Sequence, residues 1–239
     1  MAGTATKLHV LDCGSMSCDL TWLLLKPGRS IRPRAERDKP VEWYPCTTHA
    51  VVVETPEATM LWDTSCPRDW EERWVPTGLH EFFPYDRVTE EQYLDQRLAQ
   101  LGLGPEQLDY VVFSHLHFDH AGNAKMFQDA GPRLVVNDKE REFALGFEGL
   151  FTGAHLKTDY EGLDFETVSG DTEFLPGVTL IEAPGHTPGT MALKVDLSQW
   201  YASVEKLRGI AEQTNANVIF GHDAEQLWSL RRSPDGYYT

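Results

Sequence analysis

The stretch SHLHFDHAGN, residues 114–123, places four metal-ligand side chains within six positions: His115, His117, Asp119 and His120. Imidazoles and carboxylates suit zinc and similar first-row divalent ions. Because alternate residues of an extended segment point the same way, His115 and His117 can bind one ion together. Asp119 and His120 follow where Gly122 permits a tight turn, and they can bind a second ion. The pattern predicts metal-dependent chemistry.

A catalytic zinc site needs three protein ligands and an open position for water. Two further histidines stand in suitable places. His186 lies in APGHTPGT, between two Pro-Gly pairs that make a rigid loop, and His222 lies in FGHD. We therefore expect His115, His117 and His186 to bind one ion, and Asp119, His120 and His222 the other. The remaining histidines that follow strands or loops are interpreted as solvated or hydrogen-bonded residues: His9, His49, His80 and His155.

The elements around these residues alternate between strand and helix patterns. Strands are expected at 49–55, 58–65, 108–115, 133–138, within 164–186 and at 216–223, and helices at 89–102 and 203–214. Thr89 and Gln92 form a capping box for the first of these helices, and Gly102 ends it. The ligand histidines come where strands stop. This order predicts an α/β layered fold with its site at the strand ends.

Length and charge restrict the classes of function. The chain has 239 residues, a length that fits one large domain or two small ones. Its formal net charge is −16. An acidic surface repels phosphate backbones, so no nucleic-acid partner is expected. Bound divalent ions would offset part of the negative charge.

Cysteine usage and hydropathy bear on the compartment. Four cysteines all lie in the first third of the chain and are interpreted as reduced thiols. The N-terminus has no apolar signal segment, and the apolar run at 20–25 is too short to cross a bilayer. We expect a cytoplasmic protein without a membrane partner. Residues 26–40, rich in proline, glycine and charge, predict an exposed arm that is either a plain surface loop or a dimerisation arm.

The motifs together resemble those of the metallo-β-lactamase superfamily. SHLHFDHAGN matches the H-x-H-x-D-H signature, LWDTS (61–65) the upstream L-x-D-T-G/S element, and APGHTPG and FGHD the two later histidine motifs, in family order. The resemblance implies an αββα sandwich, taken as a single domain over residues 1–239 with an extended N-terminal arm at about 20–45. It also implies two divalent metal ions, zinc first, with cobalt, manganese or iron as alternatives.

Within the superfamily the sequence looks most like the N-acyl homoserine lactone lactonases, the quorum-quenching enzymes. SHLHFDHAGN, FGHDAEQ, the ending RRSPDGYYT and the long arm carry this likeness. It implies hydrolytic opening of a lactone ring by a hydroxide that two ions share, with Asp119 transferring a proton to the leaving oxygen. Asp63 would orient the ligand loop, or simply cap a turn. The likeness also allows a homodimer through the arm.

An acyl pocket next to the metals is part of the same resemblance. For each candidate residue, ordinary core packing is the alternative interpretation. The candidates are Phe118, Met16, Trp70, Trp74, Phe82, Phe83 and Tyr85.

One expected ligand is missing. After the third histidine the family carries a further strand that ends in an aspartate bridging the two metals, but no aspartate occurs between Asp196 and Asp223. The gap falls near Leu197–Gln199. Either the segment is deleted, or a loop has been omitted and the numbering closed over it; intact motifs on both flanks favour the second explanation.

Two other functions stay open at this stage. A glyoxalase II-like thioesterase, or another carboxylic-ester hydrolase of the superfamily, shares the histidine motifs, but a glutathione thioesterase needs basic residues and no basic cluster stands near them. A metal-binding but catalytically impaired member is the other, because the bridging aspartate is absent.

Overall fold

The computed structural model describes residues 6–19 and 34–214. His222, the predicted strand at 216–223 and arm residues 20–33 lie outside this part of the chain. Residues 1–196 and 197–239 form two compact units. The described part of the second unit is helix α7 (Ser198–Thr214), which begins five residues before the predicted helix at 203–214. Among the described residues, no helix is both long and apolar enough to cross a membrane.

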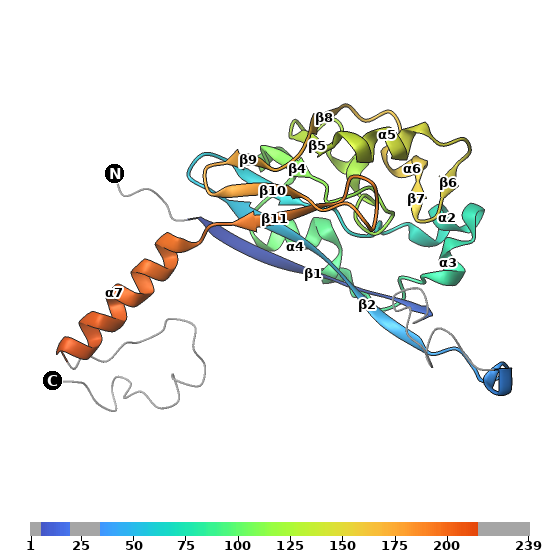
Figure 1. Cartoon of the computed structure of the whole chain (residues 1–239), viewed down its shortest axis with the longest axis horizontal. Coiled ribbons are helices and arrows are strands. Elements are labelled where there is room, and N and C mark those ends of the chain that lie inside the picture. The colour runs from blue at the N-terminus through green and yellow to red at the C-terminus, as the bar shows by residue number, and fades with distance from the viewer. Residues whose placement is uncertain (1–5, 20–33, 215–239) are drawn as a thin grey trace. The chain divides into compact units, whose positions relative to one another are not determined.

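The first unit contains two main sheets (Figure 1). The larger has the order β1 (Lys7–Asp19), β2 (Trp43–Glu54), β3 (Thr59–Trp62), β4 (Tyr110–Val112), β5 (Arg133–Asn137) and β8 (Phe165–Val168). The smaller has the order β11 (Met191–Val195), β10 (Val178–Glu182) and β9 (Thr172–Leu175), and a two-stranded ribbon joins β6 (Phe151–Thr152) to β7 (His155–Leu156). Strands β1 to β3 pair antiparallel, whereas β3, β4, β5 and β8 run parallel.

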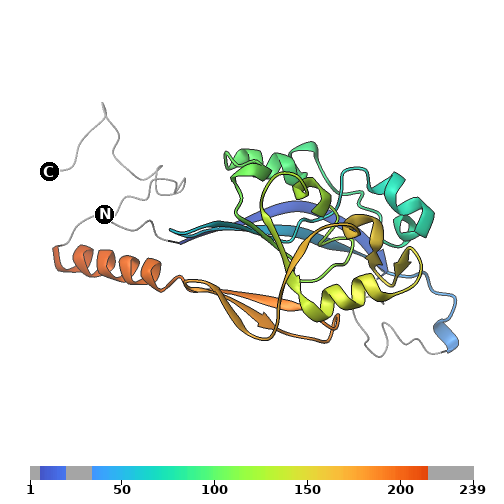
Figure 2. The same cartoon turned by 90° about the horizontal axis from the view of Figure 1, so that it is seen from above.

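Alternation along the central strands gives the larger sheet two apolar faces. In β3, Met60 and Trp62 point toward the smaller sheet, and Leu61 points the other way. The outer face packs against α4 (Leu94–Gln100) through Leu94 and Leu98. Figure 2 shows α4 and the smaller sheet on opposite sides of the larger one. Helix on sheet on sheet makes up three of the four layers of the predicted αββα sandwich.

The remaining helices are short and lie beside the sheets. They are α2 (Trp70–Trp74), α3 (Leu79–Phe82), α5 (Asp138–Gly146) and α6 (Lys157–Tyr160), with 3-10 turns at Arg34–Glu36, Val75–Thr77, Glu90–Gln92, Pro105–Gln107 and Ala124–Phe127. The prediction of one helix over 89–102 was wrong. The capping box belongs to the turn Glu90–Gln92, and Tyr93 is extended, with ψ at 146°, before α4 begins. This conformation lets the Tyr93 ring contact Tyr85 and the guanidinium of Arg68.

Two predicted boundaries also move. The strand expected at 108–115 is regular only over Tyr110–Val112, so His115 lies in the loop beyond it. The predicted arm at 20–45 ends at residue 42, because Trp43 already pairs with Asp19 in the β1–β2 ladder. The described arm residues 34–42 are exposed or half-exposed.

The parallel strands bring their carboxyl ends to one edge of the sheet, where α/β folds place their sites. Asp63, His115 and Asp138 follow β3, β4 and β5 there. The chain turns tightly at this edge: Asp63 and Ser65 have positive φ angles of 59° and 56°. Gly122 lies so close to its neighbours that an added Cβ would be 2.6 Å from the carbonyl oxygens of Phe118 and Ser65.

A buried ion pair fastens the turn after the histidine loop. The guanidinium of Arg73, in α2, donates to the carbonyl oxygen of Gly122 (2.6 Å) and to Oδ1 of Asp159 in α6 (3.2 Å). Asp159 is fully buried, and its Oδ2 has no hydrogen-bond partner among the described residues. Burial raises the pKa of Asp159 to about 7, although the charge of Arg73 opposes the rise.

We expect Gly122→Ala to destabilise the protein by about 1–3 kcal/mol, because backbone atoms on two sides must move to admit a methyl group. The free energy of unfolding measured in urea checks this. Gly146→Ala is the matched control, since nothing lies within 4 Å of its Cβ position. Equal stability of the two variants would contradict the prediction.

Asp159 predicts a pH-dependent stability. Its carboxyl holds a proton more tightly in the folded chain (pKa about 7) than in the unfolded chain (ordinary pKa 3.8), so its stabilising effect is complete below about pH 4 and is lost as pH rises toward 7. Asp159→Asn keeps a neutral group and lacks this loss. Between pH 5 and pH 7.5, the free energy of unfolding of the variant should rise by about 2 kcal/mol relative to that of wild type. Urea unfolding of the metal-free proteins measures this change. A difference that does not change with pH would refute the assignment.

Candidate metal centre

Three imidazoles meet at the carboxyl edge of the larger sheet. One ring nitrogen from each of His115, His117 and His186 lies within 4.8 Å of the others. The ring centroids are 4.5 to 4.8 Å apart. In the part of the chain that the structure describes, no other set of three potential ligands comes as close. Two loops, after β4 and after β10, supply these side chains.

His115 has the hydrogen-bond pattern of a ligand. Its Nδ1 lies 2.9 Å from Oγ of Ser114, and its Nε2 is buried without a partner among the described residues. A buried polar atom left unpaired is costly. A cation bound by His115, His117 and His186 would satisfy Nε2, so the residues present fit a divalent metal ion.

Electrostatics favour neutral rings for His115 and His117. Burial, together with the neighbouring imidazoles, lowers the pKa of His115 far below its ordinary value, and the same causes lower the pKa of His117. Neutral imidazole offers the lone pair that a metal ion requires. These rings can therefore bind a cation near neutral pH without first losing a proton.

Asp119 and His120 form a second, more polar group beside the first. His120 Nδ1 lies 2.8 Å from Oδ2 of Asp63, and its Nε2 lies 3.5 Å from Oδ2 of Asp119. Burial lowers the pKa of His120, but the two carboxylates outweigh burial and raise this pKa to about 9. The ring is only 4.0 Å from that of His115, centroid to centroid.

Asp63 holds the start of the histidine loop. Its Oδ1 accepts from the backbone N–H of Ser114 (2.7 Å), and its Oδ2 accepts from the Ser114 hydroxyl (2.8 Å). The same Oδ2 also contacts Nδ1 of His120. One carboxylate therefore orients both the backbone of the loop at Ser114 and the ring of His120. This geometry is that of an orienting residue rather than a simple turn cap.

Glu140 is a buried residue of this region that the sequence interpretation missed. Its Oε1 accepts from Leu116 N–H (2.9 Å) and His155 Nε2 (2.8 Å). Its Oε2 accepts from the Thr187 hydroxyl (2.5 Å) and Gly189 N–H (3.2 Å). Burial raises the pKa of Glu140, but the hydrogen bonds outweigh burial and hold this pKa below its ordinary value. A spacing of four residues from the buried Ala144 was the available signal for an inward-facing side chain.

His155 also has more contacts than a solvated histidine would have. It is buried, pairs with His117 as an isolated β-bridge, and its ring lies 4.4 Å from that of His117, centroid to centroid. No sequence motif surrounds it. Of the two states expected for His155, solvated or hydrogen-bonded, the structure shows the hydrogen-bonded one.

The candidate pocket residues divide by exposure. Met16, Trp74, Tyr85 and Phe118 are buried in one apolar cluster, Trp70 and Phe83 lie half-buried at its edge, and Phe82 is 53% exposed. The Phe118 ring contacts those of Trp74 and Phe83 at 4.7 and 5.3 Å between centroids. Four of the seven candidates are therefore packed as core, and Trp70 and Phe83 are better placed to meet a ligand.

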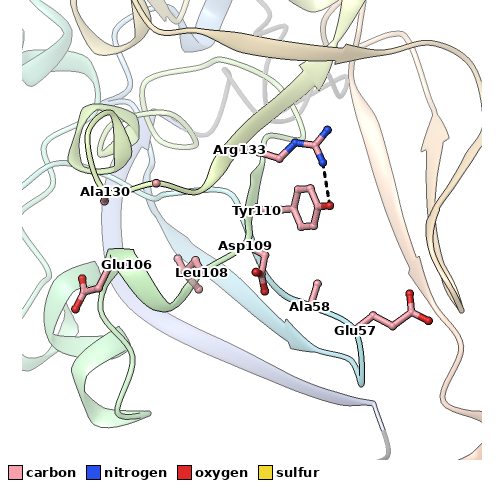
Figure 3. A pocket seen from close by; sticks show the side chains of 9 residues that line it. Glu57, Ala58, Glu106, Leu108, Asp109, Tyr110, Ala130 and Arg133 are labelled. Atoms are coloured by element: carbon pink, nitrogen blue, oxygen red, sulfur yellow. Dashed lines mark hydrogen bonds between the residues drawn. The ribbon is translucent and has the colours of Figure 1, made fainter.

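A cavity of about 410 Å³ lies at the opposite, amino edge of the parallel strands (Figure 3). Leu108, Tyr110 and Arg133 line it, and the Arg133 guanidinium donates to the Tyr110 hydroxyl (3.1 Å). It contains no histidine and is separate from the cluster of imidazoles.

The predicted gap falls between β11 and α7. Strand β11 ends at Val195 and helix α7 begins at Ser198. In this described stretch no strand or aspartate intervenes after Asp196, and the choice between a deleted segment and an omitted loop stays a prediction from the sequence. The structure thus offers no carboxylate from this segment to bridge two ions.

Comparison with known proteins places these features in a family. The model of the metallo-beta-lactamase superfamily matches residues 43–199. The chain belongs to this superfamily, and the predicted sandwich fold is confirmed.

Its relatives are N-acyl homoserine lactonases. The chain is 30% identical to N-acyl homoserine lactonase AiiB of Agrobacterium fabrum and 28% identical to AiiA of Bacillus thuringiensis subsp. kurstaki, in each case over 97% of this chain and 99% of the relative. A solved N-acyl homoserine lactone hydrolase with N-hexanoyl-L-homoserine at its catalytic metal centre has the same fold, with a TM-score of 0.63 and 24% identity over 97% of this chain and 98% of that one. The alignment with AiiB runs over 285 positions, more than the 239 residues of this chain, so it contains gaps here.

We expect Zn²⁺ to stabilise chelator-treated protein by about 2.7 kcal/mol at a concentration 100-fold above its dissociation constant. His117→Ala should lose this gain, because two imidazoles remain where three converged. Thermal unfolding with and without Zn²⁺ measures the effect. The exposed His49→Ala is the control, and an undiminished gain in His117→Ala would contradict the assignment.

Proposed function

We propose that this protein is a metal-dependent hydrolase that opens the lactone ring of N-acyl homoserine lactones. The observation that carries the proposal is the cluster of His115, His117 and His186, with an unpaired buried Nε2 on His115. The relatives over nearly the full chain are lactonases by name, which supports this substrate class.

Two divalent ions are proposed, with different strengths of binding. His115, His117 and His186 would hold the tighter one, and Asp119 and His120, with His222 from outside the described residues, the weaker one. Zinc is the first choice, and cobalt, manganese or iron also suit these ligands. Without a bridging aspartate the second site depends on fewer carboxylates. A bound divalent ion there would polarise the lactone carbonyl and acidify a water molecule.

The chain's own residues supply proton transfer and orientation. Asp119 is the half-exposed carboxylate of the site, with 25% of its side chain accessible, so its Oδ2 can take a proton from water and pass it to the ring oxygen that leaves. Asp63 keeps the histidine loop in place through Ser114. Trp70 and Phe83 are proposed to meet the acyl chain, with Phe118 behind them.

One observation favours a second candidate. No aspartate lies between Asp196 and Asp223, so the protein would be a metal-binding member with impaired catalysis if a bridging carboxylate is indispensable. The homodimer through the arm, the cytoplasmic location and the absence of nucleic-acid partners stay predictions from the sequence.

Hydrolysis of N-acyl homoserine lactones of varied chain length, followed with a pH indicator, tests the proposal. Metal-loaded wild type should turn them over, and His117→Ala should lose about 10³-fold in kcat/KM, which corresponds to several kcal/mol of lost charge stabilisation. His49→Ala should keep full activity.

Two results would contradict the lactonase proposal, and each leads to a different function. Turnover of thioesters but not of lactones would replace the proposal with a thioesterase. Metal binding without turnover of either class would establish the impaired member.

A further inference from the structure

The imidazoles that converge at the candidate centre come from two loops far apart in the sequence. His115 and His117 follow β4, whereas His186 lies between β10 and β11. One backbone hydrogen bond, from Met191 N–H to the Ser114 carbonyl, links the bases of the loops (2.8 Å). A three-coordinate arrangement of side chains needs tighter control than this, since ligand distances must hold within fractions of an ångström.

The Glu140 carboxylate contacts both loops, with one oxygen for each. Oε1 accepts from Leu116 N–H, between the two ligands of the first loop, and also from His155. Oε2 accepts from the Thr187 hydroxyl and from the Gly189 backbone N–H. Thr187 lies one residue beyond His186, and Gly189 lies three residues beyond it. A carboxylate offers about four acceptor positions, and here all four are occupied.

Two further features show that this contact is built into the fold. A Cβ on Gly189 would collide with the backbone nitrogen and Cβ of Glu140, so the second loop rests directly on the first turn of α5. His155 packs its ring against His117 while it donates to Oε1, which supports the first loop from a third direction.

We propose that Glu140 is a positioning residue for the three-histidine centre, because it sets the His117 loop and the His186 loop at the separation that a bound metal ion requires. This inference rests on the proposed metal centre. It concerns how the chain prepares that centre, and it assigns no contact between Glu140 and a substrate.

Glu140→Gln separates the two halves of the contact. An amide keeps one oxygen acceptor but turns the other position into a donor, which then faces two donors. One loop must therefore lose its support, whichever way the amide is oriented. We expect the dissociation constant for Co²⁺ to rise by about 10- to 100-fold, the usual effect of removing a partner that orients ligands. The visible absorption of the Co²⁺ form should change as well, because the ligand geometry changes.

The measurement uses full-length, metal-free protein titrated with Co²⁺ against a competing chelator, without any lactone. Glu142→Gln is the matched control: the same change, two residues away on the same helix, on an exposed side chain. Weaker Co²⁺ binding in Glu140→Gln, with Glu142→Gln like wild type, supports the proposal. Unchanged Co²⁺ affinity and spectrum in folded Glu140→Gln, even with a lowered melting temperature, overturn it.

Thr187→Val provides a second route if Glu140→Gln does not fold. It removes one donor to Oε2 at nearly constant volume and should weaken Co²⁺ binding by about tenfold; unchanged binding overturns the proposal. Where both variants fold, the double variant should lose less than the sum of the two effects, since both act through the same oxygen.

These outcomes are separate from those of the proposed function. Wild type that binds Co²⁺ without hydrolysing any lactone would remove the lactonase and keep the positioning role. An active wild type whose Glu140→Gln variant binds Co²⁺ normally would keep the lactonase and remove the positioning role.

Discussion

The buried carboxylate of Glu140 is the constraint on which the functional end of the molecule depends. A charged group in a protein interior is strongly unfavourable unless its hydrogen-bonding capacity is filled. Glu140 is 0% exposed and reaches that condition only when donors from three segments meet the carboxylate that α5 carries. The first loop, β7, the Thr187–Gly189 turn and helix α5 must therefore take up one arrangement, and that arrangement is the one in which three imidazoles face each other.

Charge is divided between the two halves of the SHLHFDHAGN loop. Burial keeps His115 and His117 neutral, whereas two carboxylates keep His120 protonated in the absence of metal. The neutral rings of His115 and His117 can bind a cation without displacing a proton.

Local pattern was sufficient to predict much of this. Short apolar runs bounded by turn residues located β2, β3 and β5, and the H-x-H spacing selected two of the three converging rings. Local pattern failed where tertiary contacts determine the backbone conformation or the role of a side chain. Tyr93 is extended because its ring packs on Tyr85 and Arg68, which breaks a segment whose spacing is helical. The roles of Glu140 and His155 were missed because their partners lie 15 to 49 residues away, and the spacing of Glu140 from Ala144 indicates only a side chain that faces inward.

The wide separation of the ligands along the chain has a consequence for biosynthesis. His115 and His117 leave the ribosome about seventy residues before His186, and domains of this kind fold as units once their long-range partners exist. Pairing of β10 with β11 depends on residues as far as Val195. During translation the nascent chain thus exposes two histidines without their third, and metal acquisition becomes an event that follows synthesis of most of the polypeptide.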